Sequence, residues 1–271
     1  MDTSASRGQS LQIGAILLFG FLVIALTTAQ AQLVPADISR SELDHSQRVA
    51  DQLVGLETAV FETSVTGRPQ PTTIDLGPTY DDRLLAVYPP PRAGRLRTTA
   101  PATLHIDNAQ AVGDDDSFGT YWNGTTHSYT TRAISYEPAY RELDAAPRYR
   151  LEYGVLAAQY DSGSRIEIAA NRHPVVDDTA ITLLVVDGEL TATGVATESV
   201  VPERVTDSTT VDIEASGSPI RLRLPTDLSA ETWRETILDG QPTVNAVTVA
   251  GDVVTITLDS SETYELTINK I

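Results

Sequence analysis

The four histidines are the side chains of this chain best suited to acid–base catalysis or metal binding, and they are scattered singly along it. They are His45, His105, His127 and His173. No H-x-H, H-E-x-x-H or G-x-S-x-G motif surrounds them, so neither a zinc protease site nor a nucleophile elbow is indicated. The 271 residues contain no cysteine, which excludes thiol catalysis and cysteine-bound metals. We therefore expect a protein that is not an enzyme, with no catalytic residue, cofactor or metal site.

A run of three aspartates is the other group that offers metal ligands. Asp114, Asp115 and Asp116 stand in the sequence GDDDSFG, where their carboxylates offer oxygen ligands to calcium. The alternating spacing of a calcium loop and its terminal glutamate are missing. We interpret the run as an acidic loop in water, and the four histidines as surface or hydrogen-bonded residues.

One short motif offers a site for covalent modification. Asn123-Gly124-Thr125 is the only N-x-[ST] sequon, and it lies in the turn-rich stretch YWNGTTHSY. Asparagine in such a motif accepts a glycan when its segment faces outward, so Asn123 is a candidate glycosylation site. The aromatic residues beside it form either a contact surface for a sugar or partner protein, or the packed side chains of a hairpin: Tyr121, Trp122 and Tyr129.

The charge balance narrows the range of partners. The chain has 37 acidic and 19 basic residues, which gives a net charge of −18. This charge repels nucleic-acid phosphates, so no nucleic-acid partner is expected. Lys270 is the only lysine, and many carboxylates with almost no lysine resemble the composition of proteins from salt-loving archaea.

An apolar segment near the N-terminus decides the localisation. Apolar residues dominate from Leu11 to Ala31, which is close to the ~20 residues that cross a bilayer as a helix. The uninterrupted part, 13–26, also has the length of a signal-peptide core, and Ala29-Gln30-Ala31 supplies an A-x-A cleavage site. The segment is therefore either a retained anchor or a signal peptide removed after Ala31.

A second, amphipathic helix is predicted directly behind the apolar one. Apolar residues recur at helical spacing at Val49, Leu53, Leu56 and Val60. Pro35 lies between the two helical halves, and we expect it to kink or briefly break the rod.

The polar residues in front of the apolar segment have the form of a leader. Arg7-Gly8-Gln9 precedes SLQIGAILLFGFLVIAL. With the amphipathic helix and the β-rich region behind it, this order resembles the type IV pilin-like proteins, in particular those of haloarchaea. The resemblance implies that a peptidase cuts between Gly8 and Gln9 and that the apolar helix remains. Ile13 stands at the fifth position after the cut, where many bacterial pilins have glutamate, which favours a minor subunit or an anchored surface protein.

Beyond residue 64 the sequence favours short strands. The clearest predicted hairpin is ITLLVVDGELTATGV (181–195), in which Asp187-Gly188 would form a two-residue turn with positive φ. A second is VNAVTVAGDVVTITL (244–258), and YELTI (264–268) is expected to add a strand beside it. DLSAETWRETILDG (227–240) is the one later helix that the pattern predicts.

The expected fold class is α+β: a long N-terminal helix, membrane-spanning and then amphipathic, followed by a mostly antiparallel, sandwich-like β head. The expected parts are a leader at 1–8, an apolar helix at 9–34, an amphipathic helix at 35–66 and an extracellular β-rich domain at 67–271.

Two functional hypotheses follow. The first is a membrane-anchored, surface-exposed pilin-like structural or interaction protein, with a minor filament subunit as one form, and with the lipid bilayer and other pilin-like subunits as partners. It would be a single-pass protein of the cell membrane with a cytoplasmic N-terminus and an extracellular β-domain. The alternative is a secreted soluble β-sandwich binding module, released by cleavage after Ala31.

Overall fold

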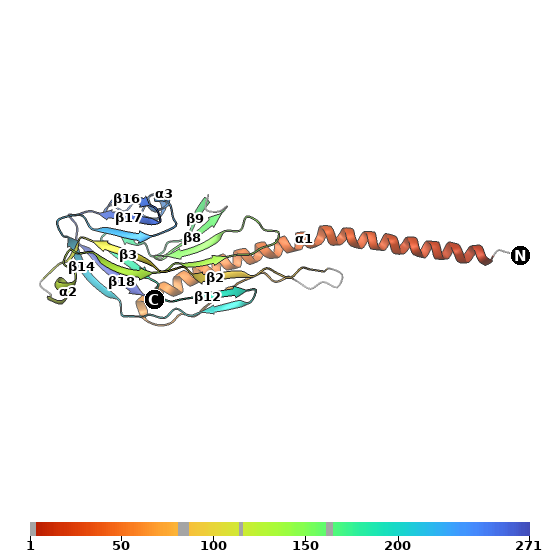
Figure 1. Cartoon of the computed structure of the whole chain (residues 1–271), viewed down its shortest axis with the longest axis horizontal. Coiled ribbons are helices and arrows are strands. Elements are labelled where there is room, and N and C mark those ends of the chain that lie inside the picture. The colour runs from red at the N-terminus through yellow and green to blue at the C-terminus, as the bar shows by residue number, and fades with distance from the viewer. Residues whose placement is uncertain (1–3, 81–86, 114–115, 161–164) are drawn as a thin grey trace.

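The structure is a computed structural model, and it describes residues 4–80, 87–113, 116–160 and 165–271. One long helix, α1 (Ser4–Thr66), leads into a head made of β-strands (Figure 1). The N-terminal part of α1 projects away from the head, and its C-terminal part packs along it (Figure 1). The α+β class with a mostly antiparallel β head is confirmed.

The expected break at Pro35 does not occur, because α1 continues through this residue. Proline removes one backbone hydrogen bond and costs a helix about 3 kcal/mol. Val34 and Ile38, on either side of it, are both buried against the head. Their packing favours the helical backbone at the position where the sequence disfavours it.

The strands form three larger sheets and one pair. The six-stranded sheet has the order β12 (Thr191–Gly194), β2 (Gly94–Thr98), β6 (Ile134–Glu137), β7 (Arg148–Glu152), β8 (Val155–Tyr160), β9 (Arg165–Ala170). The β3 sheet has the order β16 (Val244–Ala250), β17 (Val253–Leu258), β15 (Arg221–Pro225), β3 (Ala102–Asp107), β5 (His127–Thr131). The β18 sheet has the order β10 (Val176–Asp177), β11 (Ala180–Val185), β18 (Tyr264–Lys270), β14 (Thr209–Ala215), β4 (Ala109–Ala111). The separate pair is β1 (Thr72–Asp75) with β13 (Thr197–Val200).

Three short helical segments complete the described elements. They are α2 (Asp116–Tyr121), α3 (Ala230–Thr232) and the π-helical turn η2 (Trp233–Ile237). The last two confirm the helix predicted at 227–240, with Ser229 as the N-cap that accepts a hydrogen bond from the Thr232 amide.

Two hydrophobic cores hold the head together. The first lies between the β3 sheet and the β18 sheet, and it includes inward-facing residues of β3, β15, β14 and β18: Leu104, Ile106, Leu222, Leu224, Ile213 and Leu266. The second lies between α1 and the six-stranded sheet: Val49, Leu53, Leu56, Val60, Leu96, Tyr136 and Leu151. The predicted amphipathic stripe is therefore confirmed as part of the core of the head.

The hairpin predicted at 181–195 is wrong. β11 pairs in parallel with β18, whereas β12 pairs with β2 in the six-stranded sheet, so Asp187 and Gly188 connect two sheets. The reason is that β11 is buried on both faces: Leu183 belongs to the first core and Leu184 to the second. A strand with two buried faces lies inside a sheet, and tertiary pairing overrides the local turn signal.

The second predicted hairpin is confirmed. β16 and β17 pair in antiparallel fashion, and Gly251 in the turn between them has a φ of 60°. The strand expected beside it, β18, pairs instead with β11 and β14 in the other sheet.

Candidate functional site: the helix and its anchorage in the head

The N-terminal part of α1 presents apolar side chains to its surroundings. Leu18 is 71% exposed and Phe21 is 72% exposed. None of the described side chains from Gln12 to Leu33 is buried. Within the described residues, α1 is the one helix long and apolar enough to cross a membrane. Its length and composition are those of a membrane-spanning helix and also those of a signal sequence.

The helix changes its role at Val34, where burial against the head begins. From there a regular stripe of one face is buried, at spacings of three and four residues: Val34, Ile38, Glu42, His45, Val49, Leu53, Leu56 and Val60. Two members of this stripe, Glu42 and His45, are polar, and both need partners in the interior.

Glu42 is fully buried, and its carboxylate is surrounded by donors. Oε1 accepts hydrogen bonds from the Tyr80 hydroxyl at 2.8 Å and the Arg141 amide at 2.7 Å. Oε2 accepts from the amides of Glu142 at 2.8 Å and Leu143 at 3.0 Å. The carboxylate therefore connects two segments of the head, one before β2 and one after β6, to α1.

His45 lies one turn further along the same stripe. Its Nδ1 is 2.7 Å from the hydroxyl of Tyr140, and the two rings meet edge to face. Burial lowers the pKa of His45, so the neutral ring is favoured in the folded protein. The interaction joins α1 to the segment whose amides bind Glu42.

A segment of the head also reaches back along α1 toward the apolar part. Tyr88 donates a hydrogen bond from its hydroxyl to Asp37 Oδ2 at 3.0 Å. Gln30 Nε2 donates to the backbone oxygen of Val87 at 3.0 Å. The segment before β2 thus extends past the point where burial of α1 begins, to the last turn of the apolar stretch.

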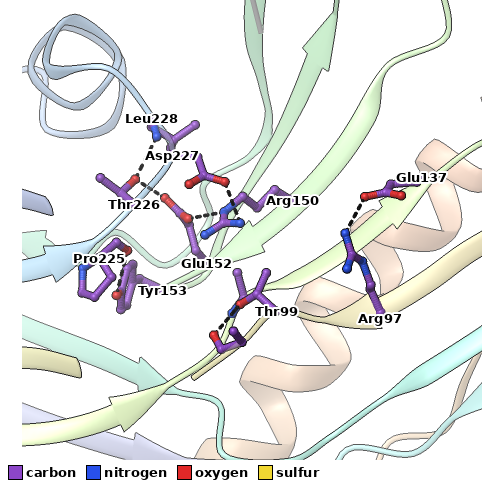
Figure 2. A network of polar contacts seen from close by, with 12 residues as sticks. Arg97, Thr99, Glu137, Arg150, Glu152, Tyr153, Pro225, Thr226, Asp227 and Leu228 are labelled. Atoms are coloured by element: carbon purple, nitrogen blue, oxygen red, sulfur yellow. Dashed lines mark hydrogen bonds and ion pairs between the residues drawn. The ribbon is translucent and has the colours of Figure 1, made fainter. Parts of the chain in front are cut away.

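The head contains a second buried polar cluster, shown in Figure 2. Arg150 Nε donates to Glu152 Oε2 at 2.6 Å, and Arg150 Nη1 is 2.8 Å from Asp227 Oδ2. The Thr226 hydroxyl donates to the other oxygen of Glu152 and accepts from the Trp233 indole at 3.1 Å. Burial raises the pKa of Glu152. These groups satisfy one another and link β7 to the segment after β15.

The cluster in Figure 2 has the geometry of a structural link. The cavity lined by Arg150, Glu152 and Tyr153 has a volume of about 20 Å³. That is room for about one water molecule and none for a substrate.

The four histidines lie at separate places: His45 on α1, and His105, His127 and His173 in the head. His105 Nδ1 is 2.8 Å from Ser128 Oγ, and the His173 ring is stacked on Phe61 with centroids 3.2 Å apart. His127 is buried beside the Tyr121 and Trp122 rings. In the described part of the chain, no three His, Asp or Glu side chains gather as a metal site would require. Asp114 and Asp115 lie outside the described residues, and Asp116 begins α2.

The predicted glycosylation site is an exposed turn. Asn123 is exposed, and Gly124 has a φ of 86°. Asn123 Oδ1 accepts hydrogen bonds from the Thr125 amide at 3.2 Å and from its hydroxyl at 2.7 Å. The turn lies after α2, at the end of the head opposite the apolar part of α1 (Figure 1).

The aromatic residues near this turn divide between two roles. Trp122 is buried in the first core, whereas Tyr121 is 52% exposed. Tyr121, Trp122 and Tyr129 are among the residues that line a cavity of about 340 Å³, and Lys270 lines it as well. The Lys270 Nζ is 2.9 Å from Asp187 Oδ2. Both sequence interpretations, contact surface and packed side chains, are compatible with this arrangement.

The two residues of the predicted leader cut lie in the backbone of α1. Gly8 and Gln9 follow the first helical residue, Ser4, by about one turn. The cut between them stays a prediction. Ala31, the alternative site, lies three residues before Val34, so that a cut there would leave the buried stripe with the head.

The contact of Glu42 with the head leaves a signal in the sequence, because polar residues continue the spacing of the apolar stripe. Ile38, Glu42, His45 and Val49 continue the same helical spacing toward the N-terminus. Two polar residues in a buried stripe predict buried partners. Their partners, from Tyr80 to Leu143, are distant in sequence and carry no motif.

The fold and this site define a β-rich head fixed to a long helix whose outer part is apolar and uncovered. Comparison with protein-family models, with curated proteins and with solved structures finds no match for the chain.

Proposed function

We propose that the chain is a membrane-anchored, surface-exposed pilin-like protein. The observation that carries the proposal is the division of one unbroken helix between two environments. Its part before Val34 is apolar and exposed, and its part after Val34 is built into a core of the head. A head fixed in this way cannot move independently of its anchor.

The apolar part suits either a bilayer or a bundle of like helices. Its length matches a bilayer core, and it carries no charged residue between Arg7 and Asp37. Other pilin-like subunits are the expected protein partners, in the role of a minor subunit. The head would lie outside the cell, with the N-terminus in the cytoplasm.

The N-terminal peptide of the protein from its own cells tests the leader cut. Trypsin cleaves an unprocessed chain after Arg7 and gives a peptide that starts at Gly8, whereas the processed chain gives one that starts at Gln9. We expect the Gln9 peptide in mass spectra. A Gly8→Val variant should keep its leader, and Gly14→Val, where an added Cβ meets no neighbour within 4 Å, should still be cut.

A peptide that starts at Gln32 would instead establish the secreted alternative. That candidate is favoured by one observation: burial begins only at Val34, so cleavage after Ala31 would leave the head nearly intact. It would lose the contact between Gln30 and Val87. Protein found in the medium, with none in the membrane, would overturn the anchored proposal.

A further inference from the structure

The segment before β2 carries an uncovered apolar side chain beside the apolar part of α1. Val87 is 79% exposed, the largest exposure among the described large apolar residues. Its backbone oxygen accepts the hydrogen bond from Gln30 Nε2. Gln30 lies in the last turn of the apolar stretch of α1, so Val87 lies level with the end of the membrane-spanning part.

Interactions of Tyr80 and Tyr88 fix the position of Val87 beside α1. Tyr88 is bonded to Asp37, and the Tyr80 and Tyr88 rings are stacked with centroids 6.2 Å apart. Tyr80 in turn is bonded to the buried Glu42. Asp37 is seven residues from Gln30, about 10 Å further from the apolar part at 1.5 Å per residue. The backbone of this segment is further stiffened by three consecutive prolines, 89–91.

The order of groups along the segment matches the layers of a membrane surface. Val87 lies nearest the hydrocarbon, and the two tyrosines follow at the level where amphipathic rings are enriched, each hydrogen-bonded to a carboxylate of α1. Contact with a bilayer would also remove the Val87 side chain from water, whereas the head leaves this side chain exposed.

We propose that Val87 and Tyr88 form a second membrane contact, in which Val87 enters the interface between lipid headgroups and acyl chains. The partner is the lipid surface itself. This inference rests on the proposed anchoring by α1. Two contacts, the helix and this segment, fix the tilt of the head on the bilayer, which one helix alone would leave free.

The absence of cysteine allows a direct test in the full-length protein. Val87→Cys, Val112→Cys and Leu18→Cys each receive one environment-sensitive fluorophore, and each replaces an exposed side chain. Val112 lies between β4 and α2, at the end of the head opposite the apolar part of α1 (Figure 1), and serves as the control. The proteins are reconstituted at about one chain per vesicle in dioleoylphosphatidylcholine with brominated acyl chains as the quencher.

We expect the Leu18 label to be strongly quenched, the Val87 label to lose roughly half its emission, as a group in the interface should, and the Val112 label to be unaffected. If Leu18 is quenched while Val87 behaves like Val112, the second contact is refuted and the anchor stands. If Leu18 escapes quenching, the anchoring proposal itself fails. A blue-shifted but unquenched Val87 label would show that protein covers it, and would refute the lipid assignment.

Discussion

Glu57 is a carboxylate inside the contact between α1 and the head. Its side chain is 1% exposed, and Oε1 has no hydrogen-bond partner among the described residues. Burial raises the pKa of Glu57, and the neighbouring Thr58 hydroxyl and Arg172 only partly oppose this effect. The charged form is therefore less favourable in the folded protein than in the unfolded chain.

Glu57→Gln should stabilise the protein at neutral pH. A raised folded-state pKa means that the wild type loses stability as the pH rises from the ordinary value of 4.5 through the folded pKa. Glutamine avoids this loss, so the variant should gain unfolding free energy at pH 7 and nothing below pH 4.5. Chemical denaturation at several pH values measures the difference.

The matched control for Glu57 is Glu62→Gln, which removes the same charge from an exposed position on the same helix. It separates the cost of burial from the general repulsion within an acidic protein. An equal gain in both variants would contradict the role assigned to burial.

Asn123 is the residue whose modification reports the location of the head. We expect a glycan on Asn123 in protein from its own cells, because the sequon lies in an exposed turn after α2, at the end of the head opposite the apolar part of α1 (Figure 1). Intact mass should exceed that of the chain, and Asn123→Gln or Thr125→Ala should abolish the excess. Thr126→Ala, which leaves the sequon intact, should retain it. An unmodified mass for the wild type would contradict this prediction.

Among the elements, the joint between α1 and the head depends on Glu42. Glu42→Gln should destabilise the protein although it preserves the shape of the side chain. Each carboxylate oxygen accepts two hydrogen bonds, so either orientation of the amide places its NH₂ group against donors. A loss of roughly 3 kcal/mol in unfolding free energy is expected, as for a broken buried charged network.

Denaturant titration of the full chain in detergent measures the effect of Glu42→Gln. Asp44→Asn, at an exposed position of the same helix, should change stability by less than about 0.5 kcal/mol. A loss of similar size in both variants would show that the four hydrogen bonds of Glu42 are not the cause.

The sequence predicts those elements whose signal is local. The stripe from Val49 to Val60 and the hairpin of β16 and β17 follow from periodicity and turn residues within a few positions of each other. The partners of β11 cannot be predicted from local signals, because its parallel pairing joins residues about 85 positions apart, such as Ile181 and Leu266. The partners of Glu42 could not be predicted from the sequence either, because they are distant along the chain and most of them are backbone amides, which leave no pattern in the sequence.

At the scale of the whole molecule, the boundary of a stable soluble head is set by the buried stripe of α1. A chain that begins at Pro35 should be soluble and folded, because it loses the exposed apolar part and keeps Val49, Leu53 and Leu56. A chain that begins at Pro71 should aggregate, because its second core is open. Size-exclusion chromatography and circular dichroism distinguish the two, and a folded Pro71 chain would show that the stripe is dispensable.

The charge of the head predicts how it responds to salt. Asp2 and Arg7 offset each other, so the residues after 34 carry the full −18. Salt shortens the screening length from about 10 Å at 0.1 M to about 3 Å at 1 M, which weakens repulsion between carboxylates. The midpoint of thermal unfolding of the Pro35 chain should therefore rise with sodium chloride. An unchanged or lower midpoint would show that repulsion between carboxylates does not limit the stability of the head.

The central position of β18 has a consequence for the time at which the head can fold. β18 lies between β11 and β14, and it supplies Tyr264 and Leu266 to the first core. Until residues 264–270 have been synthesised, β11 has no central partner, and the sheets on either side cannot close around it. The β18 sheet and the first core can therefore be completed only after residues 264–270 have been made. If the head is exported while it is being made, this sheet would close only after residues 264–270 have crossed the membrane.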